Sequence, residues 1–121
     1  MSEEYPRTRR ITLSSEIRGV LEKGRRVRAS HLDARYLASP LRFGRVGLVV
    51  PKHGHTAVER NRLKRRLREL VRRELLPTLT NLDVIIRCSP AAYHESFDQL
   101  AASIVTIREA LMEVAAGRRD P

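Results

Sequence analysis

The chain has 121 residues, which is enough for one domain with a modest core. Its 24 Lys and Arg against 14 Asp and Glu give a formal net charge of +10, which is typical of a nucleic-acid-binding protein. No apolar run approaches the roughly 20 residues of a membrane span, no secretory segment follows the polar first residues, and one cysteine cannot form an internal disulfide, so we expect a cytoplasmic protein with no membrane partner.

The first part of the chain predicts an arm followed by a short helix. Residues 1–12 are rich in arginine but lack periodic apolar residues, so we expect a flexible tail that is either solvated or in contact with RNA. We expect a second tail at residues 117–121. Ser14 is a suitable N-cap for the helix, and Gly24 is a natural stop. The inner face of this helix carries Ile17, Val20 and Leu21.

Three segments have the pattern of β-strands. In residues 31–38 apolar and polar positions alternate, as in a half-buried strand. Residues 45–50 and 82–88 are short β-branched runs that suit central strands. A further short strand near residues 25–28 remains an open alternative.

Residues 56–76 predict a basic amphipathic helix. Thr56 and Glu59 have the spacing of a capping box, and Pro77 cannot continue a helix. An apolar stripe recurs at helical spacing at Leu63, Leu67, Leu70 and Val71. The opposite side collects Arg62, Arg65, Arg66, Arg68, Arg72 and Arg73. Because a surface this positive repels itself, we expect it to lie opposite a polyanion.

A loop leads into this helix, and a second amphipathic helix ends the chain. The loop, residues 51–55, places Lys and His side chains beside a helix N-terminus, where backbone N–H groups favour an anion. Ser96 and Gln99 form another capping box, after which apolar residues step by three and four to Val114. The order of elements predicts one α+β domain over residues 1–121, a sandwich with a small mixed sheet.

The sequence offers no catalytic or metal-binding pattern. Four histidines and one cysteine lack the paired spacing of a zinc site. Cys88 follows an apolar strand, which is more typical of a small buried residue than of a nucleophile. The carboxylates Asp33, Asp83 and Asp98 are scattered. We therefore expect no catalytic residue and no metal ligand in the protein.

Residues 58–70, VERNRLKRRLREL, resemble the signature of the protein subunit of bacterial ribonuclease P. That family carries an R-N-R tripeptide, an apolar residue, Lys-Arg and an Arg in the next turn. The matching residues are Arg60, Asn61, Arg62, Leu63, Lys64, Arg65 and Arg68. The strand RVGL before the helix, Lys52 in the loop and the strand DVIIR after it also match. The similarity runs from about residue 13 to about residue 111.

The resemblance implies a fold and a role. The fold is an αβββαβα sandwich whose basic helix lies in a left-handed βαβ crossover, against the usual right-handed rule. The protein, itself monomeric and present once per RNA, binds a catalytic RNA, and the complex removes the 5′ leader of precursor tRNA. Mg²⁺ ions held mainly by the RNA cut the bond.

The resemblance also assigns residues to two surfaces. The RNA-binding residues are Lys52, Arg60, Asn61, Arg62, Lys64, Arg65 and Arg68. The leader cleft, between the first helix and the sheet, is lined by Ile17, Leu21, Arg26, Arg28, Leu32 and Arg35. Family members usually place aromatic residues in this cleft, whereas the six residues above include none. The loop of this chain also departs from the family pattern, at Pro51, His53 and Gly54. Because stacking contributes roughly 1–3 kcal/mol per base, we expect this cleft to hold the leader more through arginines than through bases.

Three other interpretations stay open. A ribosomal or ribosome-assembly protein would bind RNA without cleavage, and related folds occur in ribosomal proteins and in a domain of elongation factor G. A DNA-binding module should carry several amide side chains for base readout, and in the basic helix only Asn61 qualifies. A stand-alone nuclease would cleave without an RNA partner.

Overall fold

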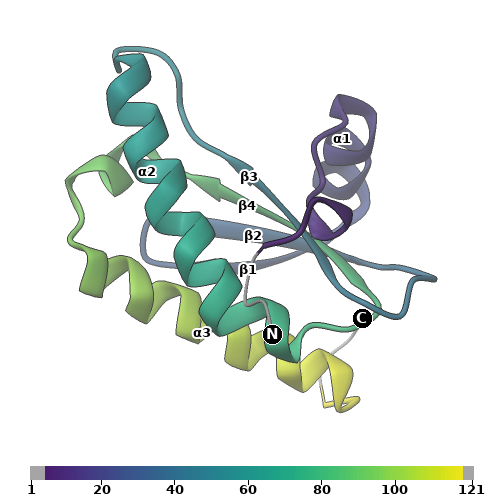
Figure 1. The fold of residues 1–121 in the computed structure, drawn as a ribbon. Helices are drawn as coiled ribbons and strands as arrows, with labels where there is room; N and C mark the ends of the chain where they lie inside the picture. Colours follow the sequence, from purple (N-terminus) through teal and green to yellow (C-terminus); the bar gives the residue numbers. More distant parts are fainter. Residues whose placement is uncertain (1–4, 119–121) are drawn as a thin grey trace.

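The computed structural model describes residues 5–118 and has the predicted αβββαβα order (Figure 1). Short 3₁₀ turns at Arg7–Arg9, Leu76–Thr78 and Pro90–His94 supplement the main elements. The helices and strands are α1 Ser14–Lys23, β1 Arg25–Ala29, β2 Leu32–Ala38, β3 Arg45–Val49, α2 Ala57–Leu70, β4 Leu82–Cys88 and α3 Phe97–Ala115.

The four strands form one mixed sheet in the order β1-β2-β4-β3. β1 pairs with β2, and β2 with β4, antiparallel, whereas β3 and β4 are parallel. Parallel neighbours need a crossover connection, and α2 supplies it, so β3, α2 and β4 form a βαβ unit. The handedness of this crossover stays a prediction. The short strand β1 confirms the alternative that the sequence left open.

The two faces of the sheet bury different groups. Leu32, Ala34 and Tyr36 of β2 belong to the main core, which α2 and α3 cover. The alternate residues of β2 face α1, where Val20 and Ile85 form a smaller apolar cluster. Figure 1 shows α2 and α3 close together, with α1 apart from both. The chain therefore has a thick apolar layer on one face of the sheet and a thin one on the other.

Both predicted capping boxes are present. The Thr56 N–H donates to Glu59 Oε1 at 2.9 Å, and the Glu59 N–H donates back to Thr56 Oγ1 at 3.1 Å. Ser96 and Gln99 make the same pair of bonds at the start of α3. The first helix differs by one residue, since Leu13, not Ser14, is the N-cap of α1.

The end of α2 widens instead of stopping at Pro77. One π-helical turn, Val71–Leu75, follows the α-helix, and a 3₁₀ turn that contains Pro77 completes the segment. Val71 and Leu75 are both fully buried. The wider turn therefore brings two apolar side chains into the core at the end of the helix.

The prediction of a flexible tail is wrong for residues 5–11. Tyr5 is buried, and its hydroxyl donates to the Val46 carbonyl. Ile11 is buried as well, and its N–H donates to Val46 O at 3.1 Å. Gly47 permits this approach, because a Cβ there would lie 2.7 Å from the Ile11 carbonyl oxygen. Residues 1–4 lie outside the described residues.

The predicted tail at residues 117–121 lies only partly within the described chain. The Gly117 N–H donates to Val114 O at 3.1 Å, and the Arg118 N–H donates to Glu113 O at 2.9 Å, which closes the end of α3. Residues 119–121 lie outside the described residues.

Arg9 ties the arm to two loops. Its guanidinium donates to the carbonyls of Gly44 at 2.8 Å, Leu76 at 2.9 Å and Leu79 at 3.1 Å. These carbonyls belong to the chain just before β3 and to the segment after α2, so one side chain joins three distant parts of the sequence.

We expect Arg9→Leu to lower the free energy of unfolding by about 2 kcal/mol, because three carbonyls lose a charged donor. Arg7→Leu, in the same turn, removes an exposed arginine and should change it by less than about 0.5 kcal/mol. Urea unfolding followed by circular dichroism measures both. Equal stability of the two variants would contradict this role for Arg9.

Candidate nucleic-acid interface

The basic helix is fixed to the core by one edge and presents the other to solvent. Leu63, Leu67 and Leu70 are buried against the sheet and α3. This seam turns the intervening residues outward. We call them the basic face, which comprises Asn61, Arg62, Lys64, Arg65 and Arg68. All are exposed except Lys64, which is half-buried.

The cations of the basic face are not neutralised within the described chain, because the acidic residues nearby are engaged elsewhere. Glu59 is held in the capping box. Glu69 pairs with Arg72 at 2.5 Å, and this hydrogen bond holds the pKa of Glu69 below its usual range. Glu74 pairs with Arg108 of α3, also at 2.5 Å. Residues 61–68 therefore present a free positive surface, while Glu69 and Glu74 compensate cations further along the chain and on α3.

Arg60 differs from the other predicted RNA-binding residues. It is half-buried, and its Nη1 donates to the His55 carbonyl at 2.8 Å. Arg60 thus helps to shape the 51–55 loop. Lys52, in that loop, is exposed and lies close to the start of the helix.

A stacked pair of rings braces the same loop. The ring centroids of His55 and Tyr93 lie 3.6 Å apart, with 10° between the planes. The Tyr93 hydroxyl donates to the Pro51 carbonyl at 2.7 Å. His55 Nδ1 lies 3.5 Å from Glu59 Oε1. The 3₁₀ turn before α3 therefore fixes both ends of the loop, a contact that no local sequence signal predicts.

The face of the sheet beside α1 carries a second group of charges. Arg45 of β3 makes a bidentate pair with Asp83 of β4, at 3.0 and 2.8 Å, and also reaches Glu16 of α1 at 3.3 Å. These bonds raise the pKa of Arg45 above its usual range. This network ties α1 to the sheet.

Most of the predicted cleft residues share this face. Arg26, Arg28 and Arg35 lie on the α1 side, because Arg35 pairs across the strands with Arg26, and Arg28 with Asp33. Ile17 and Leu21 of α1 pack against the small apolar cluster there.

Leu32 was assigned to the cleft wrongly. Its side chain is only 1% exposed and belongs to the main core. Strand alternation places it on the face opposite Arg35. The alternating pattern of residues 31–38 already carries this information.

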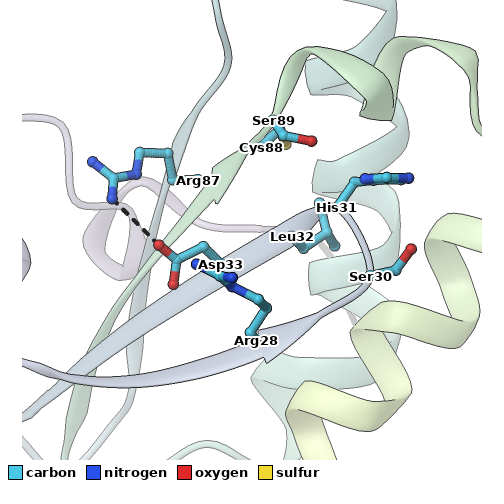
Figure 2. A pocket seen from close by; sticks show the side chains of 8 residues that line it. All are labelled: Arg28, Ser30, His31, Leu32, Asp33, Arg87, Cys88 and Ser89. Atoms are coloured by element: carbon cyan, nitrogen blue, oxygen red, sulfur yellow. Dashed lines mark hydrogen bonds and ion pairs between the residues drawn. The ribbon is translucent and has the colours of Figure 1, made fainter.

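Two residues of this face were not predicted, Asp33 and Arg87. Arg87 Nη2 lies 3.3 Å from Asp33 Oδ2, and both border a pocket of about 350 Å³ at the end of the sheet (Figure 2). The alternation of Asp83, Ile85 and Arg87 along β4 was the available signal, but the apolar centre of this strand suggested burial on both faces.

A second pocket lies between the basic face and α1. It has a volume of about 250 Å³, and the arm and β3 also line it. Lys64 and Arg68 of the basic face line one side, and Ile17 of α1 lines the other. This pocket therefore has cations of the basic face on one side and an apolar residue of α1 on the other.

The described residues contain neither a metal-binding group nor an activated thiol. No cluster of three or more His, Cys, Asp or Glu side chains lies together within residues 5–118. Burial raises the pKa of Cys88 to about 12, which keeps this thiol protonated near neutral pH. Within the same residues, no helix has the length and apolar character needed to cross a bilayer.

The family model for Ribonuclease P matches residues 5–112. The chain belongs to the Ribonuclease P family. This family assignment covers both the basic helix and the α1 side of the sheet.

Relatives and solved structures agree with the family assignment. The chain is 36% identical over 99 residues to the ribonuclease P protein component of Acidothermus cellulolyticus, covering 80% of this chain and 82% of that protein. It is 39% identical to the component of Thermus aquaticus over 70% of this chain and 49% of that protein. The match to the Syntrophobacter fumaroxidans component, at 43% identity, spans 52% of this chain and 53% of that protein. The chain thus matches about half the length of two of these relatives.

The fold is also that of solved Ribonuclease P proteins. The structure from Staphylococcus aureus aligns with a TM-score of 0.74 at 22% identity and covers 88% of this chain and 94% of that chain. The structure from Thermotoga maritima aligns with a TM-score of 0.74 at 18% identity and covers 84% and 96%.

We expect Tyr93→Leu to loosen the 51–55 loop, because it removes both the ring stack and the hydroxyl bond. The His55 amide, which donates to Lys52 O, should then exchange with solvent about fivefold faster, since an aromatic pair contributes about 1 kcal/mol. Tyr93→Phe keeps the ring and should show a smaller increase. Hydrogen exchange measured by NMR gives both rates, and unchanged exchange in Tyr93→Leu would refute the brace.

Proposed function

We propose that this chain is the protein subunit of a ribonuclease P ribonucleoprotein. It binds the catalytic RNA and the 5′ leader of precursor tRNA, and so promotes endonucleolytic removal of the leader to give the mature 5′ end. The observation that carries this proposal is the basic face, a row of uncompensated cations on a helix fixed to the core. Family membership and the names of the relatives support it.

The protein's contribution to RNA binding is electrostatic. Each cation that contacts a phosphate releases condensed counterions, and for a duplex log K falls with log salt by about 0.9 per phosphate. Lys52, Arg62, Lys64, Arg65 and Arg68 are the cations that we assign to these contacts. Asn61, at the start of the row, is exposed and free to bond to a ribose or a base.

We assign the cutting step to the RNA, with Mg²⁺ held mainly by RNA oxygens. When bound there, Mg²⁺ would activate the attacking water and stabilise the leaving oxygen. The protein's inward carboxylates are poor candidates as its ligands, because Asp33 and Asp83 are both engaged by arginines. The protein's task is then affinity and positioning, in a cytoplasmic particle with one protein per RNA.

The leader is assigned to the α1 side of the sheet. Arg26, Arg28 and Arg35 supply positive charge there, and Ile17 and Leu21 supply apolar contact. No aromatic ring lies among these residues, so the leader is held mainly through its phosphates. The pocket beside β3, which Lys64, Arg68 and Ile17 line together, supports this assignment because it lies between the RNA-binding helix and α1.

The assignment of the basic face is tested by Arg65→Ala, because Arg65 is exposed and makes no ion pair in the described chain. We expect about five- to tenfold weaker binding to the catalytic RNA and a salt dependence shallower by about one in slope. Arg118→Ala, an exposed arginine at the end of α3, is the control and should leave both unchanged. If Arg65→Ala and Arg118→Ala bind alike across a salt titration, the assignment is wrong.

The leader assignment is tested by Arg28→Ala, in titrations of the assembled complex with leader-bearing and with mature tRNA. Within the described chain Arg28 makes no ion pair, so its removal should not disturb the fold. We expect weaker binding of leader-bearing tRNA by the assembled complex with little change for mature tRNA. An RNA-binding protein of the ribosomal kind would show no dependence on the leader, and this outcome would favour that alternative.

A further inference from the structure

The α1 side of the sheet holds a group of arginines that converge on one carboxylate. Asp33 of β2 lies directly opposite Arg28 of β1 and Arg87 of β4 in the strand register. Its carboxylate is 3.3 Å from Arg26, 3.7 Å from Arg35 and 3.3 Å from Arg87. Four arginines therefore surround a single acidic residue, and the cluster keeps a net charge of about +3.

This cluster is paired loosely, in contrast with Arg45 and Asp83 on the same face. The Arg45–Asp83 pair is bidentate at 2.8 and 3.0 Å, and both side chains are less than one-fifth exposed. The bonds to Asp33 are longer, and its partners Arg26 and Arg87 are 47% and 43% exposed. Arg45 is therefore locked in place, whereas Arg26 and Arg87 can turn toward an external anion.

Unmet bonding capacity remains at the centre of the cluster. Asp33 Oδ1 and Arg35 Nε are both buried, and neither makes a hydrogen bond. Arg35 is positioned by another contact, since its Nη1 donates to the Leu21 carbonyl at 2.9 Å. A buried donor without a hydrogen bond is costly, so Arg35 Nε gains by meeting an acceptor such as a phosphate oxygen, whereas Asp33 Oδ1, itself an acceptor, does not.

The neighbouring pocket provides room for that partner. It has a volume of about 350 Å³ and is bordered by Arg28, Asp33, Arg87 and the turn at Ser30 and His31 (Figure 2). Figure 2 shows Arg28 and Arg87 approaching Asp33 from the two neighbouring strands. A phosphate in this pocket meets Arg28 and Arg87 at once, and it competes with Asp33 for the latter.

We propose that Asp33 is a specificity-determining residue, an internal anion that competes with the phosphates of single-stranded RNA for Arg26, Arg35 and Arg87. That the ligand is a single strand rests on the function proposed above. With no RNA bound, Asp33 reduces the mutual repulsion of the arginines and keeps them gathered. With RNA bound, it weakens their hold, so that a short strand dissociates readily and only a strand with further contacts to the complex is retained.

The test compares Asp33→Asn with Asp98→Asn, which makes the same change of net charge at an exposed position in the first turn of α3. The probe is a labelled short oligouridylate, titrated at several salt concentrations. We expect Asp33→Asn to bind about fivefold more tightly than Asp98→Asn at low salt. Its salt dependence should be steeper by about 0.7 in slope, the value for one more neutralised phosphate on a single strand. Asp33→Glu, which keeps the charge, should bind as the parent does.

Two outcomes would overturn the proposal. Equal affinities of Asp33→Asn and Asp98→Asn would mean that only net charge matters. Weaker binding by a folded Asp33→Asn than by the parent would mean that Asp33 positions the arginines without competing for them.

A measurement on the parent protein keeps the proposal testable if Asp33→Asn does not fold. Arginine Nε–H resonances are followed by NMR as oligouridylate is added. Those of Arg26 and Arg87 should shift, while that of Arg45, locked to Asp83, should not. Shifts of all three, or of none, would contradict the proposal.

Failure of the function proposed above gives a different result. If the protein does not stimulate a catalytic RNA, that proposal falls, but the comparison of Asp33→Asn with Asp98→Asn still decides whether the carboxylate competes with RNA. If stimulation is observed and the two variants bind alike, only the role of Asp33 is lost.

Discussion

The apolar seam between α2 and the sheet is the constraint on which the rest of the structure depends. Leu63, Leu67 and Leu70 are almost fully buried, and full burial of one such side chain contributes roughly 1.5–3 kcal/mol. This attachment fixes the rotation of the helix, and so determines which residues face outward. The basic face then persists without internal counter-charges because the core compensates for the repulsion among its cations.

The fold sorts the positive charges into two classes. Some arginines make bonds that stabilise the fold: Arg9 donates to three carbonyls, Arg45 pairs with Asp83, and Arg108 pairs with Glu74. Others remain without an ion pair in the described chain, among them the cations of the basic face on α2. The net charge alone does not distinguish the two classes. The acidic residues decide between them by their position in the fold.

Local patterns in the sequence predicted most elements, because capping boxes and apolar periodicity are encoded within a few residues. Thr56 with Glu59, and Ser96 with Gln99, set the starts of both long helices as expected. What the sequence could not supply were contacts between distant segments. The arm was expected to be flexible, since neither the Tyr5 bond to Val46 nor the Arg9 bonds leave a periodic signal.

The difference between local patterns and contacts of distant segments also explains which parts of the candidate site could be predicted. The outward direction of the basic face follows from the apolar stripe of one helix, although that stripe does not reveal the bond of Arg60 to the His55 carbonyl, whereas the cleft is built from four separate elements. Leu32 was assigned to the cleft, although the alternation of residues 31–38 places its side chain on the opposite face of the sheet, in the main core. Arg87 was missed because the apolar centre of β4 suggested burial on both faces, and its contact with Asp33 depends in addition on the pairing of β2 with β4.

The most direct test of the central claim is cleavage of precursor tRNA by a ribonuclease P RNA at low magnesium concentration, with and without this protein. The account predicts that the protein, freed of all RNA, cleaves nothing alone. It also predicts that adding the protein to the RNA accelerates removal of the 5′ leader, and that this acceleration fades as salt is raised. Cleavage by the RNA-free protein, or no acceleration of the RNA at any salt concentration, would contradict it.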